Sequence, residues 1–325
     1  MDWLGAGIDG PLVVIRALHF AASAMTSGIL VFRALVIDAA AAPSTPARAI
    51  VGAQTLRLAW FCLALSLVTG MIWLLLEATS MSGLSFAEAV TGKVLSTVVN
   101  QTQFGQVSEI RFVLAVTLAC CMRYDRFPLA RGLALAMSLG LIAAIAWTGH
   151  AGSTAGEWGI LHLAADALHL LAAAAWTGGL ASLVLLLWAS RRDRTSASAS
   201  FARQATRRFS TIGIVIVVAI LASGIVNTWI LVGSLHALIA TGYGQLLIVK
   251  IALFAVMVWF AAANRFWLTP GLALPSGDTQ RDALRRLTRN SAIELALALI
   301  IFAIVGILGT MHPAIHGFAS ATPMQ

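Results

Sequence analysis

The sequence predicts an all-α membrane protein that crosses the bilayer several times. Hydrophobic residues make up 59% of the 325 residues and charged residues only 10%, well below the roughly 25% charged residues of an average soluble protein. Long apolar runs recur along the whole chain, and about 18 such residues are enough for a helix to span a bilayer. Basic residues cluster in alternate connections between these runs. Together these observations predict a polytopic helical bundle without a sizeable soluble domain.

Eight apolar runs are long enough to cross the membrane. The first run has no basic flank and no small-residue cleavage site, so we interpret it as a retained helix and not as a signal peptide. The expected transmembrane helices, in chain order, cover residues 11–36, 57–77, 107–123, 131–149, 159–188, 209–233, 245–264 and 291–309.

The distribution of basic residues predicts the orientation of these helices. Of the 21 basic residues, 17 lie in four connections, 33–57, 123–131, 191–208 and 265–289, and the opposite connections hold only Lys93. By the positive-inside rule, the Arg-rich connections are cytoplasmic and both termini are periplasmic. The formal net charge of +8 therefore reflects membrane topology, and it gives no reason to expect nucleic-acid binding.

Two connections are longer than the others. The external one contains residues 84–100, which we expect to form a surface helix. The cytoplasmic one, residues 265–290, includes the basic sequence RDALRRLTR, interpreted as a solvated loop; contact with anionic membrane lipids is the alternative. Glu294 follows Ser291 at the spacing of a capping box, so we interpret Glu294 as the mark of a helix start and not as a buried acid.

The two halves of the chain resemble each other. The sequences ALHFAASAMTSGIL (17–30) and ALHLLAAAAWTGGL (167–180) match at 7 of 14 positions. Further along, FGQVSEIRFVL (104–114) aligns with YGQLLIVKIAL (243–253). Because the matches occur in the same order, the first four helices resemble the last four.

This resemblance predicts a tandem 4+4 repeat. Residues 1–150 form the first four-helix repeat and residues 151–325 the second. Four helices return the chain to its starting side, so the repeats are parallel and related by a pseudo-two-fold axis along the membrane normal. We expect ligand sites where the halves meet. The paired glycines Gly178 and Gly179 are expected to let helices approach closely.

Three ionisable residues interrupt one of the apolar runs. His162, Asp166 and His169 stand at positions i, i+4 and i+7 and share one helix face. A rise of about 1.5 Å per residue separates the two histidines by roughly 10 Å, too far for one small ion. Ionisable groups inside a membrane are costly and suggest function, and imidazole with carboxylate is a ligand set for Cu, Zn, Fe or Ni. This spacing fits a short ladder of metal sites, or one site at His169 and Asp166 with His162 at its mouth.

The repeat adds further histidines to this set. His19 pairs with His169, and the motif Thr148-x-His150 pairs with Thr310-x-His312. The alternative for each histidine is an interhelical hydrogen bond, and for Asp166 it is a salt bridge to a buried basic residue. The six candidate metal ligands are His19, His150, His162, Asp166, His169 and His312.

The three cysteines, Cys62, Cys120 and Cys121, lie near the expected cytoplasmic ends of their helices. The cytoplasmic side is reducing, so we expect no disulfide. We interpret the cysteines as packing residues. The alternative is a soft exit site for Cu(I) that also uses Met122.

Five motifs occur in order along the second half of the chain and the end of the fourth helix. They are TGHAG (148–152), HLLAAAAWTGGL (169–180), RRFS…ASGIVNTWILVGS (207–234), YGQLLIVKIALFAVM…NRFWLTP (243–270) and LRRLTRNSAIELALAL…GTMHP (284–313). This ordered set resembles the copper-resistance protein D (CopD) family of bacterial inner-membrane proteins. The resemblance covers the fourth to eighth helices strongly and the first three by the eight-helix architecture alone. It implies a role in copper passage across, or homeostasis at, the inner membrane.

The expected function is copper transport, with import from the periplasm, and not enzymatic catalysis. Copper ions would be collected by the histidines nearest the outside and passed inward to the Asp166 and His169 region. The chain has no Walker motif, so we do not expect ATP-driven pumping. The family often occurs beside or fused to a periplasmic copper-binding CopC domain, and we expect a separate CopC-like protein as a partner here. The oxidation state of the copper stays open.

Two alternatives remain at the level of sequence. The first is a b-type membrane cytochrome or haem-handling enzyme, in which His19 and His169, or His150 and His312, would ligate haem. The second is a non-transporting membrane partner of a periplasmic copper chaperone. An absorption spectrum separates the first alternative from copper transport.

Overall fold

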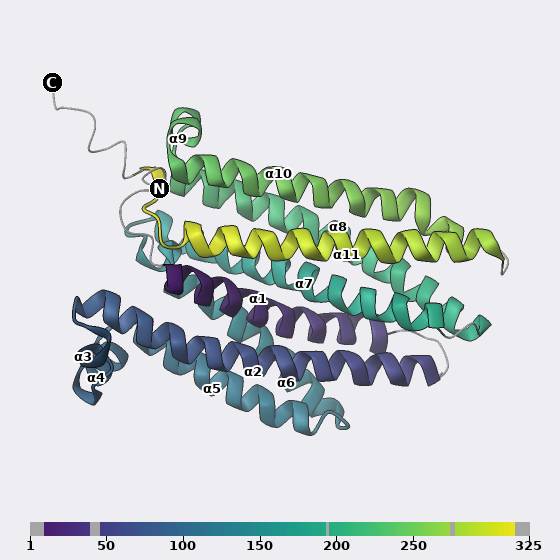
Figure 1. Ribbon diagram of the computed structural model, residues 1–325, viewed down its shortest axis with the longest axis horizontal. Helices are drawn as coiled ribbons and strands as arrows, with labels where there is room; N and C mark the ends of the chain where they lie inside the picture. Colours follow the sequence, from purple (N-terminus) through teal and green to yellow (C-terminus); the bar gives the residue numbers. More distant parts are fainter. Residues whose placement is uncertain (1–9, 40–45, 193–194, 274–276, 316–325) are drawn as a thin grey trace.

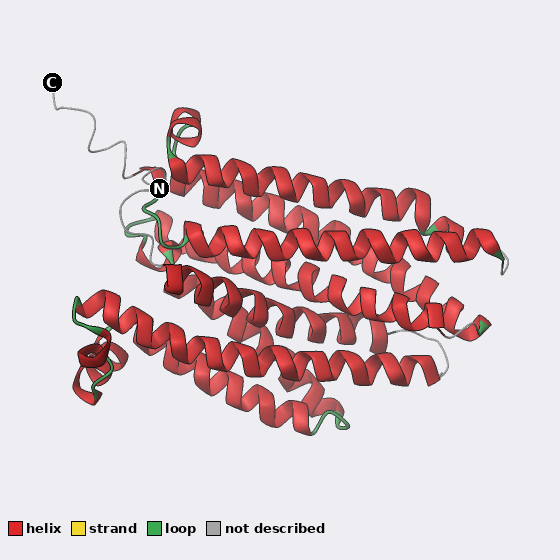
Figure 2. Ribbon diagram, viewed as in Figure 1, coloured by secondary structure: helices red, strands yellow, loops and turns green. Residues whose placement is uncertain are grey.

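The computed structural model describes residues 10–39, 46–192, 195–273 and 277–315, and every regular element in these ranges is helical (Figure 2). Eight helices in this part of the chain are long and apolar enough to cross a membrane, which confirms the all-α polytopic prediction. They run along the long axis of the molecule (Figure 1). The eight are α1 (Gly10–Phe32), α2 (Pro46–Ser82), α5 (Gln103–Arg123), α6 (Pro128–Ala143), α7 (Trp158–Arg192), α8 (Ser196–Val232), α10 (Gly242–Ala263) and α11 (Asp278–Leu308).

Short elements connect these helices. Helices α3 (Phe86–Ala89) and α4 (Gly92–Gln101) form the external connection, where a surface helix is predicted, and most of their residues are exposed. The others are α9 (Leu235–Ala240), the π-helical segments η2 (Arg33–Asp38) and η5 (Asn264–Leu268), and the 3₁₀ segments η3 (Ala144–Thr148), η4 (His150–Ser153) and η6 (Pro270–Ala273).

Helices α1 and α7 form the centre of the bundle. In the most apolar window of each helix, 72% of α1 and 67% of α7 is buried, against 39% or less in the other six. Figure 1 shows α2, α5 and α6 on one side of this pair and α8, α10 and α11 on the other. The outer helices therefore present most of their apolar surface to the membrane.

The close approach predicted at Gly178 and Gly179 is confirmed. A Cβ atom on Gly178 would lie 2.6 Å from the Cα of Gly28 in α1, and a Cβ on Gly179 would overlap the ring of Phe209 in α8. The absence of a side chain at Gly178 lets the helix backbones of α1 and α7 touch, and its absence at Gly179 makes room for the Phe209 ring.

Three helices begin well before the predicted apolar runs. Helix α2 begins at Pro46, α8 at Ser196 and α11 at Asp278. The residues before the apolar runs, 46–56, 196–208 and 278–290, contain Arg and Ala, which are strong helix formers. Hydropathy detects only the apolar part of a helix. The sequence RDALRRLTR lies inside α11, so its interpretation as a loop is wrong.

The interpretation of Glu294 as a helix start is also wrong. Glu294 lies in the middle of α11 and its exposed fraction is only 2%. The capping-box spacing between Ser291 and Glu294 occurs here within a continuous helix. Glu294 is therefore a buried acid.

The chain changes direction at two opposite ends of the bundle (Figure 1). At one end α1 is followed by α2, α5 by α6, α7 by α8 and α10 by α11, and at the other end lie α3, α4, η4 and α9. The termini, residues 1–9 and 316–325, fall outside the described residues. We call the two ends the Arg-rich end, marked by Arg33, Arg126, Arg192 and Arg265, and the histidine end, marked by His150 and His312.

Candidate functional site

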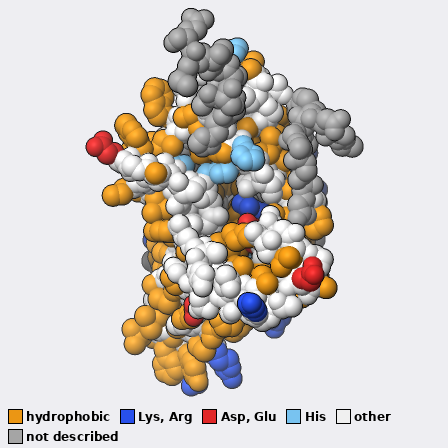
Figure 3. All heavy atoms as spheres, turned by 90° about the vertical axis from the view of Figure 1, so that its left-hand side faces the viewer, with side chains coloured by type: hydrophobic (Ala, Val, Ile, Leu, Met, Phe, Trp, Pro, Cys, Tyr) orange, Lys and Arg blue, Asp and Glu red, His pale blue; other side chains and the backbone are white. Residues whose placement is uncertain are grey.

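Three of the predicted ligands lie together at the histidine end. His150 begins η4, His162 lies in the second turn of α7, and His312 follows α11. Both His162 and His312 are close enough to His150 to interact with it electrostatically. Seen from this end, histidine side chains gather beside a hollow in which a basic side chain is visible (Figure 3). We call His150, His162 and His312 the outer histidine cluster.

The ring of His150 is held in a state suited to metal ligation. It donates a hydrogen bond to the backbone carbonyl of Leu308, and its Nε2 atom is buried without a hydrogen-bond partner. The Nδ1 atom is therefore the donor, and Nε2 carries a lone pair. Burial lowers the pKa of His150, the hydrogen bond to Leu308 opposes this shift, and the charge of Arg16 adds to it. The imidazole therefore stays neutral, as a metal ligand must be.

His162 is supported by a residue that the sequence reasoning did not identify. The Thr154 hydroxyl donates to the carbonyl oxygen of His150 at 2.9 Å, so its oxygen is left to accept the Nδ1–H of His162 at 2.7 Å. This leaves the lone pair of His162 on Nε2. A ligating histidine usually donates its other ring N–H to such a supporting group. Thr154 thus links two members of the outer histidine cluster.

Asp166 and His169 form a second group, deeper along α7. The Nδ1 atom of His169 lies 3.1 Å from the hydroxyl of Ser223 in α8, and Asn227 of α8 donates to Asp166 Oδ1 at 3.1 Å. Lys250 of α10 is close enough to interact electrostatically with both Asp166 and His169. We call Asp166 and His169 the inner pair. The sequence placed this pair correctly on one face of α7, but not its contacts with α8 and α10.

The hydrogen-bond partners of His19 belong to α2 and α5 and not to the inner pair. Its Nδ1–H donates to the carbonyl oxygen of Ser66 at 3.0 Å and lies 3.1 Å from the Thr69 hydroxyl. Its Nε2 accepts a hydrogen bond from the buried Arg111 of α5. Both ring nitrogens are thus occupied by protein groups, and the arrangement is that of a structural histidine between α1, α2 and α5.

Buried basic residues lie beside the histidines. The guanidinium carbon of Arg16 in α1 lies 5.2 Å from the centre of the Trp73 ring. The guanidinium also packs against Gly309, and its charge acts on His150 of the outer histidine cluster. Trp73 in turn donates to Glu77 at 3.0 Å, whose charge acts on Arg16. Arg16 thus lies beside the outer histidine cluster, and Glu77 is the acid whose charge acts on it.

The six predicted ligands do not form one closed coordination site. Within the described residues, no group of three or more His, Cys, Asp or Glu side chains could hold a metal ion. The structure arranges the candidates as the outer histidine cluster, the inner pair and the separate His19.

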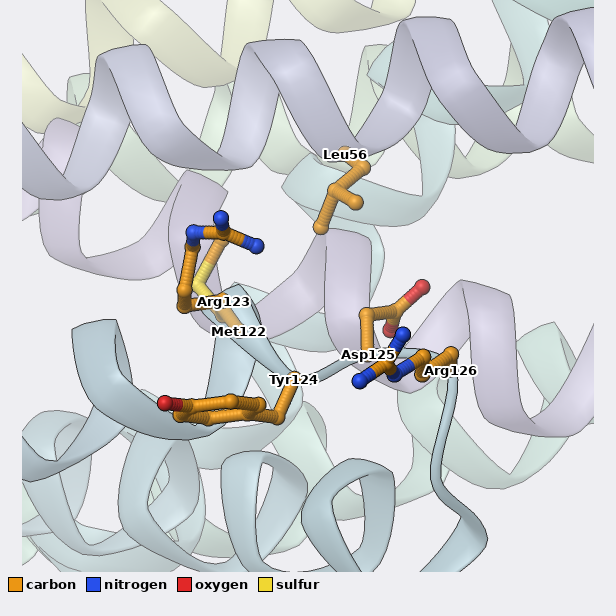
Figure 4. A pocket seen from close by; sticks show the side chains of 6 residues that line it. All are labelled: Leu56, Met122, Arg123, Tyr124, Asp125 and Arg126. Atoms are coloured by element: carbon orange, nitrogen blue, oxygen red, sulfur yellow. The ribbon is translucent and has the colours of Figure 1, made fainter.

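A pocket of about 370 Å³ lies at the Arg-rich end, at the turn from α5 to α6 (Figure 4). Arg33 donates to Asp125 on its wall at 2.7 Å. Met122 also lines the pocket, but Cys62 is buried and Cys120 is exposed. Among the described residues the cysteines form no metal-binding group, so we keep the packing interpretation.

Comparisons with known proteins cover both halves of the chain. The family described as Copper resistance protein D matches residues 203–308. The family described as Copper resistance protein D-like, N-terminal domain, matches residues 7–160. The second match extends the similarity over the first three transmembrane helices, for which the sequence motifs gave only the architecture. No solved structure matches the chain.

Three curated relatives are similar to this chain. Copper resistance protein D of Pseudomonas syringae pv. tomato is 32% identical over 255 residues, which cover 77% of this chain and 81% of the relative. Inner membrane protein YebZ of Escherichia coli (strain K12) is 30% identical over 304 residues, 93% and 98% of the two chains. Copper transport protein CutJ of Bacillus subtilis (strain 168) is 37% identical over 132 residues, 40% of this chain and 23% of the relative.

These matches agree with the fold. An inner-membrane relative of nearly the same length and eight apolar helices identify a multi-pass protein of the bacterial inner membrane. The similarity to copper resistance and copper transport proteins supports a role connected with copper. Both copper resistance protein D models match this chain, and a curated relative of that name aligns over 77% of it. This chain therefore belongs to the copper resistance protein D family.

Proposed function

We propose that the protein is a transporter that carries copper ions across the inner membrane from the periplasm. The observation that carries this proposal is the buried, unpartnered Nε2 atom of His150, which lies beside His162 and His312. A buried nitrogen lone pair without a partner is costly, and a metal ion would satisfy it. Relatives of this chain are named as copper resistance and copper transport proteins, which favours copper over the other metals that imidazole binds.

The proposal includes an orientation. The Arg-rich end lies in the cytoplasm, in line with the positive-inside rule, and the histidine end and both termini lie in the periplasm. A separate CopC-like protein would then deliver copper to the outer histidine cluster. The concentration of arginines in the connections at one end of the bundle supports this orientation.

The proposal also includes the 4+4 repeat, with residues 1–150 and 151–325 as its halves. One pair of matching contacts supports it. His19 accepts a hydrogen bond from Arg111, and His169 lies near Lys250, the residue aligned with Arg111.

Transport requires the inner pair to take the ion from the outer histidine cluster. His169 lies two helical turns below His162 on α7, or roughly 10 Å, so Asp166 between them is placed to shorten the step. The Asp166 carboxylate also offsets the positive charge of Lys250. We assign His19 to positioning Arg111 and not to ligation, since both of its ring nitrogens are engaged. Because both ring nitrogens of His19 already bind protein groups, they also argue against haem ligation by His19 together with His169.

Copper binding by the purified protein tests this proposal. X-ray absorption at the copper edge should report imidazole nitrogen in the copper coordination shell of the wild type. His150→Ala should weaken binding by about tenfold or more, the lower range for residues that support metal sites. His236→Ala, in the exposed α9 at the same end, is the matched control. An unchanged affinity and spectrum in His150→Ala would refute the proposed entry site.

A further inference from the structure

The proposed copper pathway does not include the buried acid Glu294. Its side chain lies in the middle of α11 and faces the interior between α7, α8 and α10. Asn264 donates to Glu294 Oε1 at 2.6 Å, and the indole of Trp176 in α7 donates a second hydrogen bond to the carboxyl group. Glu294 is thus held in place by groups from two neighbouring helices.

The acid belongs to a larger polar group. Asn290, one turn before Glu294 in α11, donates to Asn264 Oδ1 at 3.0 Å, which fixes the orientation of the Asn264 amide. Asn264 begins the π-helical segment η5, and its carbonyl oxygen accepts the Thr269 hydroxyl at 2.7 Å. Such π-helical segments often occur at functional sites.

A cavity of about 260 Å³ lies against this group. Most of its wall is apolar, but Ser291 and Thr206 also line it, and their buried hydroxyl oxygens have no hydrogen-bond partner. Arg265, which marks the Arg-rich end, and the exposed Phe266 beside it also line the cavity, so the cavity extends toward the Arg-rich end of the bundle. Buried water in proteins binds to polar groups that lack a protein partner, as these two hydroxyls do.

The carboxyl group has no cation beside it on the cavity wall. The charged residues that line the cavity are Glu294 and Arg265, and Arg265 is directed to the Ser210 hydroxyl, to which it donates at 2.8 Å. The lining residues from α7 and α8 are uncharged. An ionised carboxylate buried without an opposite charge is unstable, and such a group takes up a proton or a cation. The two hydrogen bonds it accepts leave lone pairs on the carboxyl group for either.

We propose that Glu294 is a proton-binding site, loaded through water in this cavity from the Arg-rich end of the bundle. The step is a proton transfer: the Glu294 O–H bond forms as a hydronium ion in the cavity gives up a proton and becomes water, and it breaks when the proton returns to water. No electron transfer is involved. Ser291 and Thr206 hold the water that carries the proton.

The position of this site couples it to the inner pair. His162, His169 and Trp176 follow one another on α7 at intervals of seven residues and therefore share one helix face. Trp176 donates to Glu294, so the proton-binding site continues the line from the outer histidine cluster toward the Arg-rich end. The coupling of proton movement to ion movement rests on the proposed copper transport, whereas proton binding by Glu294 does not.

Infrared difference spectroscopy of the purified protein without copper tests proton binding alone. The difference between wild type and Glu294→Gln at about neutral pH should contain the C=O band of a protonated carboxyl group. Glu109→Gln is the matched control, because Glu109 lies in a membrane-spanning helix but is exposed. A wild-type spectrum without that band would overturn the proposal, whatever the copper measurements give.

Copper flux into proteoliposomes tests the coupling. Glu294→Gln should lose most of the copper uptake driven by a pH gradient, at least a tenfold decrease, but should keep exchange of labelled for unlabelled copper, which needs no net proton movement. Glu109→Gln should retain both activities. Loss of exchange together with uptake in a folded Glu294→Gln, or uptake equal to wild type, would overturn the coupling. Absence of uptake and exchange in the wild type would instead refute the proposed transport.

Discussion

Gly28 of α1 and Gly178 of α7 lie backbone to backbone at the centre of the bundle. A Cβ atom on Gly178 would lie 2.5 Å from the Ile29 amide nitrogen, and one on Gly28 would lie 2.8 Å from the Gly178 Cα. Real Cβ atoms do not approach other atoms this closely, so the two central helices can cross at this distance only because both residues are glycine. The two glycines also occupy matching positions in the sequence similarity between the halves.

We expect Gly28→Ala to destabilise the protein, because the added methyl group would push α1 and α7 apart. Overpacking of this kind costs about 1–3 kcal/mol, and thermal unfolding in detergent would measure it. Gly213→Ala is the control, since a Cβ on Gly213 of α8 meets no atom within 4 Å. There the substitution should be neutral or stabilise the helix by up to about 1 kcal/mol. Equal unfolding temperatures for the two variants would contradict the close crossing.

The proposed orientation predicts where fused reporter domains become active. Fusions after Arg126 and after Asp278 should be active in the cytoplasm, because both positions lie at the Arg-rich end. A fusion after Met311, close to the outer histidine cluster, should be active in the periplasm. The inverse pattern would place the cluster on the wrong side for copper capture from the periplasm.

His19→Ala should destabilise the protein without removing copper from the outer histidine cluster. The substitution deletes hydrogen bonds to Ser66 and Thr69 and leaves the buried Arg111 without its acceptor. Loss of a buried partner costs about 1–3 kcal/mol, visible as a lower unfolding temperature. If His19→Ala instead unfolds like the wild type but loses bound copper, His19 is a ligand, as the sequence alone suggested.

The pH dependence of copper binding tests the state of His150. Protons compete with copper for Nε2, and burial lowers the pKa of His150. The ring therefore stays neutral as pH falls through about 6.5, the ordinary histidine value, and copper should be released only at lower pH. Titration of bound copper against pH measures this release. A wild-type midpoint at or above about 6.5 would refute the assignment.

Much of the fold follows from local sequence patterns. Apolar runs mark the eight helices because a helix needs about 20 apolar residues to cross the hydrocarbon core of a bilayer. The spacing of His162, Asp166 and His169 places them on one face because the α-helical period is a local property. The glycines at the α1 and α7 crossing were likewise visible in the sequence.

The rest depends on contacts between distant segments, which one sequence does not reveal. The hydropathy pattern does not reveal the N-terminal segments of α2, α8 and α11, because these segments are helical but contain Arg and few apolar runs. Glu294 was assigned to a helix start because its spacing to Ser291 fits a capping box; only the packing of α7 and α10 against α11 buries it. Thr154 carries no sequence signal of its own, since threonine is common in connections, and its role follows from the position of two histidine rings.

Copper uptake into proteoliposomes of defined orientation tests the central claim most directly. With the histidine end outside, the wild type should accumulate copper in a saturable manner. His169→Ala should fall to the level of empty vesicles while copper still binds at the outer histidine cluster, because only the inner pair is removed. Wild-type vesicles that take up no more copper than empty ones, or His169→Ala vesicles that take up copper at the wild-type rate, would contradict the account.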